Sequence, residues 1–227
     1  MRDTVVLIPA AGRGERLGPG VPKAMRELGG EPLLAHAVRR MAAAPSVAHV
    51  VVAAPSGLEG QVRLLLKERD HAAVTVVTGG SDRPSSVAAA LAAAPAECDI
   101  VLVHDAARPL APAALAERVA AAVRAGHDAV IPAQPAVDTV KQVDLEGQVL
   151  ATPDRASLRL VQTPQGFRRP VLVAAHAAHG DVVATDDAAM VERLGVKVHT
   201  VPGSSQAFKV TMPFDFAVAE LMLEREL

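Results

Sequence analysis

Short apolar runs rich in valine and isoleucine alternate with longer helix-like stretches through the first 131 residues of this chain. Near-continuous apolar strands separated by helices are typical of a parallel sheet that is covered by helices on both faces. The alternation therefore predicts an α/β fold with a mostly parallel sheet. The expected strands are Thr4–Ile8, His49–Ala53, Val74–Val77, Ile100–His104 and Ala129–Ile131, and the expected helices are Pro32–Ala44, Leu58–Lys67, Ser85–Ala94 and Pro112–Ala125.

The alternation ends after Ile131, and the next segment has a different pattern. Polar and apolar side chains alternate over residues 137–152 around Glu146-Gly147, which indicates a β-hairpin. Because an isolated hairpin is marginally stable in water, we expect residues 137–155 to form a protruding arm that packs on a second copy of the chain. A solvent-facing flap on a monomer is the alternative. Helices at 170–179 and 186–194, a strand at 197–201 and a helix from Pro213 complete one expected domain over residues 1–227.

The composition argues against several classes of function. The net charge of −2 gives no basic excess to attract nucleic acid, and the absence of Tyr and Trp removes the usual base-stacking side chains. The single cysteine, Cys98, cannot form an internal disulfide, which predicts a reducing compartment. The apolar run near the N-terminus is too short for a signal peptide or a membrane span. We therefore expect a cytoplasmic protein that binds neither nucleic acid nor a membrane.

The first expected strand opens into a glycine-rich loop, Pro9–Leu17, which is followed by Lys23. A P-loop would need a Lys-Ser or Lys-Thr pair after the glycines, and no such pair follows here. A dinucleotide-binding loop would need a third glycine where Leu17 stands. A nucleotidyltransferase loop, in which a nucleoside triphosphate lies over the main chain, accounts for both cations, Arg16 and Lys23. An ordinary glycine turn is the simplest alternative.

Two further clusters follow expected strands. Residues 79–86 combine glycines with hydroxyl groups at a helix start, where they could bind a base and a ribose, although a helix cap by Ser85 explains the same pattern. Asp105 and Arg108 follow the next strand. Asp105 could hold a Mg²⁺ ion that bridges triphosphate oxygens, since Mg²⁺ usually takes one or two carboxylates plus substrate phosphates. Arg108 could hold a second phosphate, and a salt bridge between Asp105 and Arg108 is the alternative.

The second half of the chain contributes polar residues that suit a phosphate monoester. Thr185 is expected to be the N-cap of the helix after it, and Lys209 is a cation in an apolar, strand-like context. A zinc site at His176 and His179 is disfavoured because no third ligand is near in the sequence. The other candidates are Asp138-Thr139, Lys141 and Arg155 on the arm, the segment Thr163–Phe167, Asp186-Asp187 and Val210-Thr211.

Taken together, these motifs resemble those of the 2-C-methyl-D-erythritol 4-phosphate cytidylyltransferases of the non-mevalonate isoprenoid pathway. The opening loop is shared by many sugar-phosphate nucleotidyltransferases, whereas the later segments are more specific. Two positions depart from the pattern: Ala24 often corresponds to Gln, and Ser205-Gln206-Ala207 replaces an acidic or Asn-rich run. The matching segments are Pro9–Leu17 with Lys23, Gly79–Ser86, His104–Pro109, Asp138-Thr139, Thr163-Pro164-Gln165, Thr185-Asp186-Asp187 and Lys209-Val210-Thr211.

The resemblance implies a Rossmann-like α/β domain, a homodimer joined through the arm, and transfer of CMP from CTP to methylerythritol phosphate with Mg²⁺ as cofactor. A cytidylyltransferase for another polyol phosphate, such as ribitol 5-phosphate, and a non-catalytic nucleotide-binding protein remain as alternatives. The implied site consists of Arg16, Lys23 and Lys209 at the reacting phosphates; Asp105 as Mg²⁺ ligand; Ala10, Ala11, Gly12, Gly79, Ser86, Asp105 and Ala106 at the nucleotide; and Arg108, Thr139, Arg155, Thr163 and Thr185 at the second substrate, with Thr139 and Arg155 supplied by the partner's arm.

Overall fold

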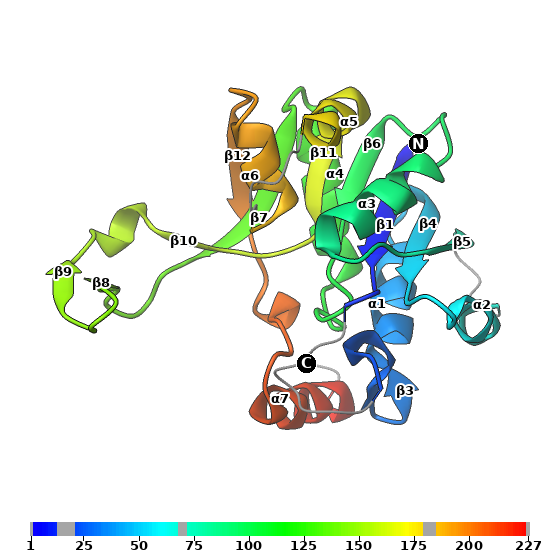
Figure 1. Ribbon diagram of the computed structural model, residues 1–227, viewed down its shortest axis with the longest axis horizontal. Coiled ribbons are helices and arrows are strands. Elements are labelled where there is room, and N and C mark those ends of the chain that lie inside the picture. Colours follow the sequence, from blue (N-terminus) through cyan, green and yellow to red (C-terminus); the bar gives the residue numbers. More distant parts are fainter. Residues whose placement is uncertain (1, 13–20, 68–71, 179–184, 226–227) are drawn as a thin grey trace.

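A mixed, mostly parallel β-sheet forms the centre of the molecule (Figure 1). The computed structural model describes residues 2–12, 21–67, 72–178 and 185–225. Within these residues the eight-stranded sheet has the order β10-β7-β11-β6-β1-β4-β5, and β12 pairs with β7 off this path. Its strands are β1 (Thr4–Pro9), β4 (Val47–Ala54), β5 (Ala73–Thr78), β6 (Ile100–Val103), β7 (Ala129–Pro135), β10 (Arg159–Val161), β11 (Gln165–Arg168) and β12 (Val198–Pro202).

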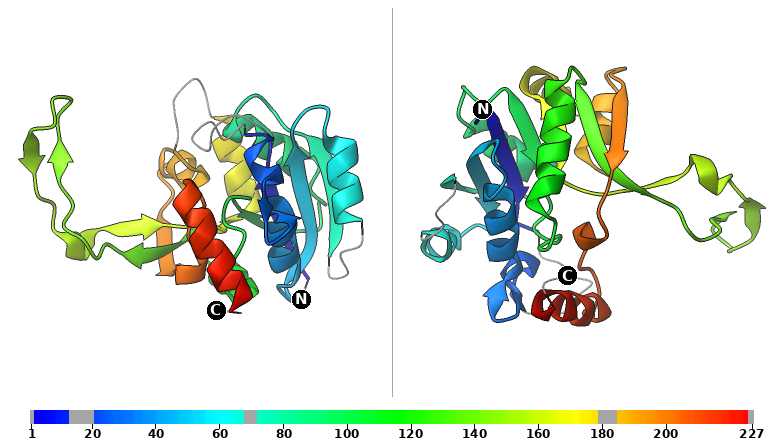
Figure 2. Two further views of the ribbon diagram at one scale, coloured as in Figure 1. Left: turned by 90° about the horizontal axis from the view of Figure 1, so that it is seen from below. Right: turned by 180° about the vertical axis from the view of Figure 1, so that it is seen from behind.

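Helices cover both faces of the sheet, as the apolar strands predict (Figures 1 and 2). Side chains alternate between the two faces along a strand, so Val6 and Ile8 belong to one core cluster while Val5 and Leu7 belong to the other. The first cluster includes α1 (Leu33–Ala42), α2 (Glu59–Leu66) and α4 (Ala113–Arg124), and the second includes α3 (Arg83–Ala92), α5 (Arg169–Ala177) and α6 (Asp187–Glu192).

A third cluster lies beyond one end of the sheet. Leu28 and Leu33 pack there with Ala219 of the C-terminal helix α7 (Pro213–Glu224). The short strands β2 (Glu27–Leu28) and β3 (Glu31–Pro32) pair with each other beside it, after the 3₁₀ turn η2 (Lys23–Met25). The cluster joins α7 to the segment after the first loop, so both chain regions meet at one end of the sheet.

The expected parallel strands and their helices are confirmed, with ends shifted by a few residues. The antiparallel strands β10 and β11 were not expected. β11 lies between β6 and β7 and runs antiparallel to both. A side chain is excluded at Gly166 of this strand, since a Cβ atom there would lie 2.5 Å from Val119 Cγ1 on α4. This close packing requires glycine, and a glutamine precedes it. The strand therefore lacks the apolar pattern that would have predicted it from the sequence.

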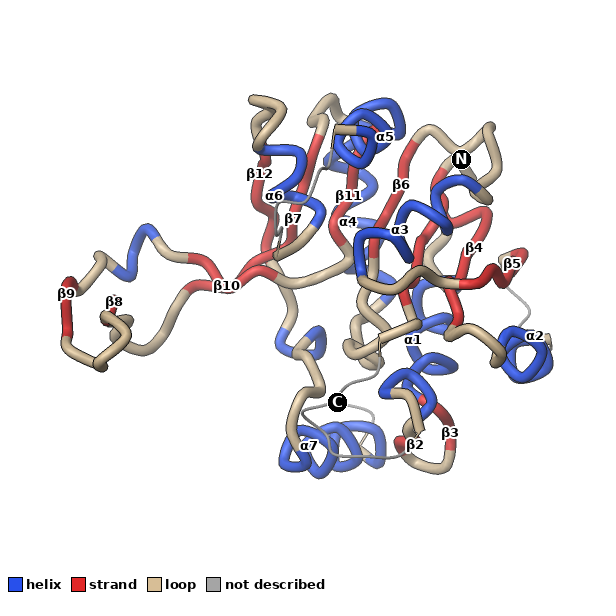
Figure 3. The backbone as a smooth tube through the Cα atoms, in the orientation of Figure 1, coloured by secondary structure: helices blue, strands red, loops and turns tan. Residues whose placement is uncertain are grey.

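The segment after β7 extends away from the sheet as a thin arm (Figures 1 and 3). It carries β8 (Gln142–Val143) and β9 (Val149–Ala151), which pair antiparallel, and the 3₁₀ turn η3 (Arg155–Ser157). Gly147 has φ +86° in the turn between the two strands, so the hairpin predicted around Glu146-Gly147 is confirmed. β10 then returns the chain to the sheet beside β7.

None of the described helices is both long and apolar enough to cross a lipid bilayer.

Candidate active site

A cavity of about 230 Å³ opens at the carboxyl ends of β1 and β6, which is the edge where ligands bind in sheets of this kind. Five segments of the chain line it. They are the first loop, the 3₁₀ turn η2, the segment that leads into α3, the loop after β6 and the segment after the 3₁₀ turn η4 (Ser205–Ala207). The lining residues are Pro9, Ala10, Ala11, Gly12, Lys23, Ala24, Gly80, Ser81, Asp82, Arg83, Ser86, Asp105, Ala106, Ala107, Lys209 and Thr211.

The first loop lies tightly against the segment that follows β5. The Ala10 N–H donates to the Ala53 carbonyl at 2.8 Å, and the Gly79 N–H donates to the Ala54 carbonyl at 2.7 Å. A Cβ atom on Gly79 would lie 2.6 Å from the Ala11 Cβ. Gly79 therefore stands behind the cavity wall and lets the two loops approach, while Gly80 lines the cavity. Arg16 lies outside the described residues.

The start of α3 forms a second wall. Asp82, not Ser85, is the N-cap, because its carboxylate accepts from the Ser85 N–H at 2.8 Å. Ser85 stands three residues later and completes a capping box, so the alternative of a helix cap by Ser85 is wrong. The Ser86 hydroxyl accepts from the Gly80 N–H at 3.1 Å and donates to the Asp82 carbonyl at 2.7 Å. Ser86 thereby fixes the glycine turn beside the cavity.

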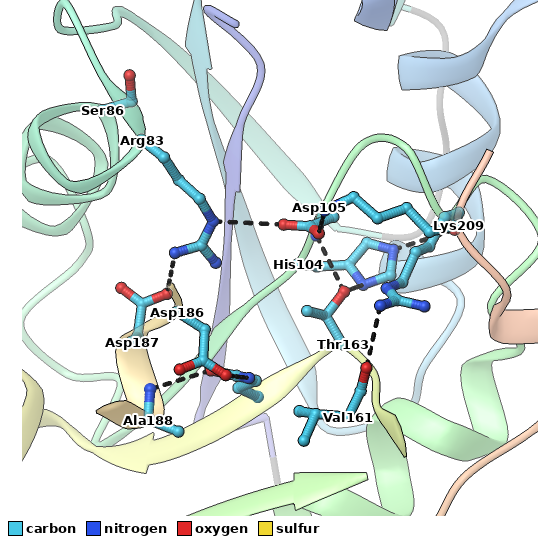
Figure 4. A network of polar contacts seen from close by, with 12 residues as sticks. Arg83, Ser86, His104, Asp105, Val161, Thr163, Asp186, Asp187, Ala188 and Lys209 are labelled. Carbon is cyan, nitrogen blue, oxygen red and sulfur yellow. Dashed lines mark hydrogen bonds and ion pairs between the residues drawn. The ribbon is translucent and has the colours of Figure 1, made fainter. Parts of the chain in front are cut away.

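Asp105 lies at the centre of a network of charged side chains (Figure 4). One carboxylate oxygen is 2.8 Å from Lys209 Nζ and the other is 3.5 Å from Arg83 Nε. Burial alone would raise the pKa of Asp105, but Arg83 and Lys209 outweigh it and hold the pKa well below its usual range. The carboxylate is therefore ionised at neutral pH, and the alternative of a salt bridge with Arg108 is wrong, because Asp105 pairs with Arg83 and Lys209.

Arg108 and Thr163 face the protein rather than the cavity. The Arg108 guanidinium donates to the Ala207 carbonyl at 2.6 Å and to the Val161 carbonyl at 3.2 Å. The buried Thr163 hydroxyl accepts from the Asp105 N–H at 3.1 Å and lies 3.0 Å from His104 Nδ1. Both side chains hold the loop after β6 in place, and neither is among the residues that line the cavity.

His104 lies directly beneath this loop and is fully buried. Its Nε2 lies 3.3 Å from the Arg108 carbonyl, which can only accept, so Nε2 carries the proton and Nδ1 accepts from Thr163. Burial lowers the pKa of His104 to about 4, against the opposing charge of Asp105. His104 is therefore a neutral, structural histidine.

A second carboxylate lies behind Arg83. Asp187 Oδ2 is 2.6 Å from Arg83 Nη1, and Asp187 Oδ1 is 3.0 Å from His176 Nε2. Asp186 next to it caps α6 by accepting from the Ala189 N–H at 2.9 Å. The expected N-cap at Thr185 is therefore wrong, because the helix begins one residue later. Thr185 itself is exposed and does not line the cavity.

Lys23 and Lys209 line the cavity from two separate segments, and Asp215 interacts with both segments. Its carboxylate accepts from the N–H groups of Thr211 and Met212 at 2.6 and 2.7 Å, which fixes the turn just after Lys209. The positive charge of Lys23 contributes to lowering the pKa of Asp215, although burial opposes the shift. The predicted convergence of these two lysines is thus observed.

The two arm candidates lie away from the cavity of their own chain. Thr139 and Arg155 are exposed, and neither is among the described residues that line the cavity. Arg155 donates to the Val137 carbonyl at 2.9 Å within the arm. Their expected role toward the second substrate therefore stays a prediction.

The sequence pattern assigned no role to Arg83, Asp187 or Asp215. Arg83 and Asp187 nevertheless belong to segments that were predicted to take part in the site. Their partners are distant in the chain, so no local spacing signals the pairs. His36 also has partners that the sequence did not suggest, since its ring nitrogens lie 2.8 Å from the Leu28 carbonyl and from Arg39 Nη2.

Asp105 is the residue that fits a divalent cation. The described residues contain no cluster of three or more metal-ligating side chains. A single ionised carboxylate on a cavity wall with two lysines nearby suits a Mg²⁺ ion that takes its other ligands from phosphates and water. The donor set is too small for a metal that relies on protein ligands alone.

A mostly parallel sheet with a small-residue loop, an acidic group and converging lysines at its carboxyl edge defines an α/β protein of the nucleotidyltransferase class. Comparison with known proteins gives the family. A model of the 2-C-methyl-D-erythritol 4-phosphate cytidylyltransferase family matches residues 4–225. The chain belongs to this family.

Individual relatives agree over almost the whole chain. Proteins of that name from Streptomyces coelicolor and Frankia casuarinae are 54% and 53% identical over alignments of 231 and 219 positions. These alignments cover 98% and 96% of this chain and 85% and 80% of the relatives. The crystal structure of a protein of that name from Thermus thermophilus is 37% identical with a TM-score of 0.76, and covers 96% of this chain and 98% of that chain. A 4-diphosphocytidyl-2C-methyl-D-erythritol synthase from Anaerococcus prevotii has a TM-score of 0.85 at 27% identity, over 98% of both chains.

Proposed function

We propose that this protein is an enzyme that transfers CMP from CTP to 2-C-methyl-D-erythritol 4-phosphate and releases pyrophosphate. The observation that carries the proposal is the convergence of Lys23, Asp105 and Lys209 on one cavity at the carboxyl edge of the sheet. Two lysines beside one carboxylate suit a triphosphate and a second phosphate at the same place. Family membership supplies the identity of the two substrates.

The nucleoside would bind against the wall built from the first loop and the start of α3. Ala10, Ala11 and Gly12 expose main chain there because they have small or no side chains. Ser86 and Gly79 fix the opposite side, and Ala106 closes the edge beside Asp105. Small residues at these positions would leave room for a base and a ribose close to the main chain.

The reaction would need no side-chain base, because a phosphate monoester is already an ionised nucleophile. Its oxygen attacks the α-phosphorus of CTP, a P–O bond forms, and the bond to pyrophosphate breaks. Lys23 and Lys209 would stabilise the charge that develops on the α-phosphate and on the leaving group. Holding both substrates in line supplies the rest of the rate enhancement. Arg16 is proposed to act with these lysines on the basis of its motif.

Asp105 would hold the Mg²⁺ ion, which supplies charge neutralisation for the triphosphate. For that purpose the Lys209 ammonium, now 2.8 Å from the carboxylate, would turn toward the phosphates. Lysine suits this change because its ammonium is a point charge on a flexible stem.

The binding site for the second substrate would be completed by another chain. We propose a homodimer in which the arm, residues 137–155, brings Thr139 and Arg155 to the partner's cavity to bind the methylerythritol phosphate. Exposed apolar side chains along the arm support this, among them Leu145, Val149 and Leu150. Within the chain, Arg108 and Thr163 would act by shaping the loop after β6, and Thr185 stays a substrate-binding candidate at the start of α6.

A cytoplasmic location stays a prediction, as does the absence of nucleic-acid and membrane partners. The lone Cys98 is buried, and burial raises the pKa of its thiol. A thiol of this kind is a small core side chain, in keeping with a reducing compartment.

The experiment is pyrophosphate release with CTP, Mg²⁺ and either 2-C-methyl-D-erythritol 4-phosphate or ribitol 5-phosphate. Turnover confined to methylerythritol phosphate is the expected result. Turnover with ribitol phosphate alone would keep the chemistry and change the pathway. No turnover with either, together with tight CTP binding, would contradict the proposal and favour a non-catalytic nucleotide-binding protein.

A further inference from the structure

Arg83 lies between two carboxylates from different parts of the chain (Figure 4). Its Nη1 is 2.6 Å from Asp187 Oδ2, and its Nε is 3.5 Å from Asp105 Oδ1. The guanidinium is a planar, rigid fork of N–H groups. Fixing it on the Asp187 side therefore also fixes the direction in which Nε points on the Asp105 side.

Asp187 is held more firmly than Asp105. Its side chain is 0% exposed, and its two oxygens contact different basic side chains, Arg83 and His176. A buried carboxylate without such partners would be strongly destabilising, so its orientation is set by the fold. Asp105 by contrast lies on the cavity wall and has Lys209 as its second neighbour.

We infer that Asp187 is a positioning residue of the active site: it holds Arg83, and Arg83 holds the Asp105 carboxylate on the wall of the nucleotide cavity. Lys209 cannot perform this task during the reaction, because its flexible side chain is 40% exposed and its ammonium is required at the phosphates. Arg83, whose side chain is 28% exposed, remains in place. The inference rests on the proposed function, since it assigns Asp105 a role toward a metal–nucleotide complex.

A purely structural role makes a different prediction. If Asp187 only joined α6 to α3, its loss would weaken folding and would affect nucleotide binding equally with and without metal. If it acts through Arg83, its loss frees the guanidinium to pair fully with Asp105 and compete with the metal. Nucleotide binding without metal would then not weaken, because the cavity would have gained positive charge.

The test is calorimetric binding of CTP alone, in excess Mg²⁺ and separately in EDTA, to the full-length protein. We expect Asp187→Asn and Arg83→Met each to weaken CTP binding in Mg²⁺ by about 10- to 100-fold, the range seen when residues that orient a metal ligand are removed. In EDTA the dissociation constant of Asp187→Asn should match or fall below that of the wild type. The double variant should be no weaker than Arg83→Met, since Asp187 acts through Arg83.

Asp3→Asn is the matched control, because Asp3 pairs with Arg124 at 2.7 Å at the opposite end of β1. It removes a comparable ion pair and should leave both dissociation constants unchanged. If Asp187→Asn fails to fold, Arg83→Met carries the test: because it also removes a positive charge from the cavity lining, its loss of CTP affinity should be larger in Mg²⁺ than in EDTA.

Four outcomes would overturn the inference. Three concern the variants: wild-type affinity in Mg²⁺, an equal loss in Mg²⁺ and EDTA, or additive losses in the double variant. The fourth is wild-type binding that does not respond to Mg²⁺. A wild-type protein that binds no CTP under either condition would instead refute the proposed function, so the two failures are distinguishable.

Discussion

The cavity edge of the sheet and the arm differ in how their side chains are paired and buried. At the cavity, Arg83, Asp105 and Asp187 are paired with one another within one chain and are largely buried. On the arm, Leu145 is fully exposed and Arg155 donates only to a nearby carbonyl. The charged side chains at the cavity edge are therefore held in place within one chain, whereas the arm carries an exposed apolar surface. The two regions should respond differently to substitution.

The largest expected effect belongs to the cavity. Lys209→Ala should lower kcat by about 10²–10³-fold, or roughly 3–4 kcal/mol of barrier, because it removes a positive charge that would stabilise the developing negative charge. Lys23→Ala should do the same. Steady-state pyrophosphate release measures both, and the exposed Lys197→Ala is the control that should keep wild-type kcat. Near-wild-type turnover of either cavity variant would remove that lysine from the mechanism.

The next effect concerns His104, which is buried beneath the loop after β6. Burial lowers the pKa of His104 to about 4, so between pH 6.5 and 4 the unfolded state binds the proton more readily than the folded state. Stability from this source is complete above pH 6.5 and is lost as the pH falls, by roughly 3 kcal/mol for a shift of this size. Urea unfolding of the apo protein at pH 7 and pH 4.5 should show this loss.

His104→Gln removes the titrating group while keeping a polar side chain that can bond to Thr163. The variant should be less stable than the wild type at pH 7, with a smaller decrease on acidification. An identical pH dependence in both proteins would show that His104 is not held neutral.

A smaller effect is expected on the arm. Arg155→Ala should raise KM for the sugar phosphate about tenfold, roughly 1.4 kcal/mol, and leave KM for CTP unchanged, because a charge-assisted contact to one substrate is lost. Initial-rate measurements with each substrate varied in turn would show this split. Arg118→Ala, which removes an exposed arginine outside the arm, serves as control. Equal changes in both KM values would mean that Arg155 is not the substrate clamp.

A substitution on the arm's apolar surface is expected to have the smallest effect on the stability of a single chain. Its effect on dimer assembly should be clear. Leu150→Asp changes a side chain that is 60% exposed, so unfolding free energy of the monomer should change by less than about 0.5 kcal/mol. Sedimentation velocity should nevertheless show a shift from dimer to monomer, since the charge would be buried in the partner. Leu64→Asp on α2, at 75% exposure, should leave the dimer intact. A dimer that tolerates Leu150→Asp would show that the arm is not the interface.

The sequence predicted the parts of the fold that depend on local pattern. The apolar runs that became β1, β4 and β6 are buried on both faces, and such strands are recognisable without any partner in view. β11 escaped prediction because its place between β6 and β7 depends on the fit of Gly166 beneath α4. The helix caps at Asp82 and Asp186 were misplaced onto neighbouring hydroxyl residues for a related reason, since several capping residues stand side by side there.

The candidate site likewise contains residues that the local sequence pattern predicts and residues that it does not. Lys23, Asp105 and Lys209 belong to motifs at strand or segment ends, so their convergence could be predicted from the edge of the sheet. The pairing of Arg83 with Asp187 could not, because it joins two helices separated by about a hundred residues and leaves no periodic trace. Arg108 was expected at a phosphate but holds main-chain carbonyls, a role that only the three-dimensional arrangement reveals.

Cytidylyl transfer at a site shared by two chains is most directly tested by mixing variants. Lys23→Ala and Arg155→Ala chains would each be assayed alone and after joint refolding, with CTP, Mg²⁺ and methylerythritol phosphate well below its KM. Mixed dimers would contain one intact site, formed by the cavity of the Arg155→Ala chain and the arm of the Lys23→Ala chain. The expected result is recovery of roughly a quarter of wild-type pyrophosphate release, since half of randomly formed dimers are mixed and each has one such site. No recovery above the sum of the separate variants, with mixed dimers demonstrated, would contradict a shared site.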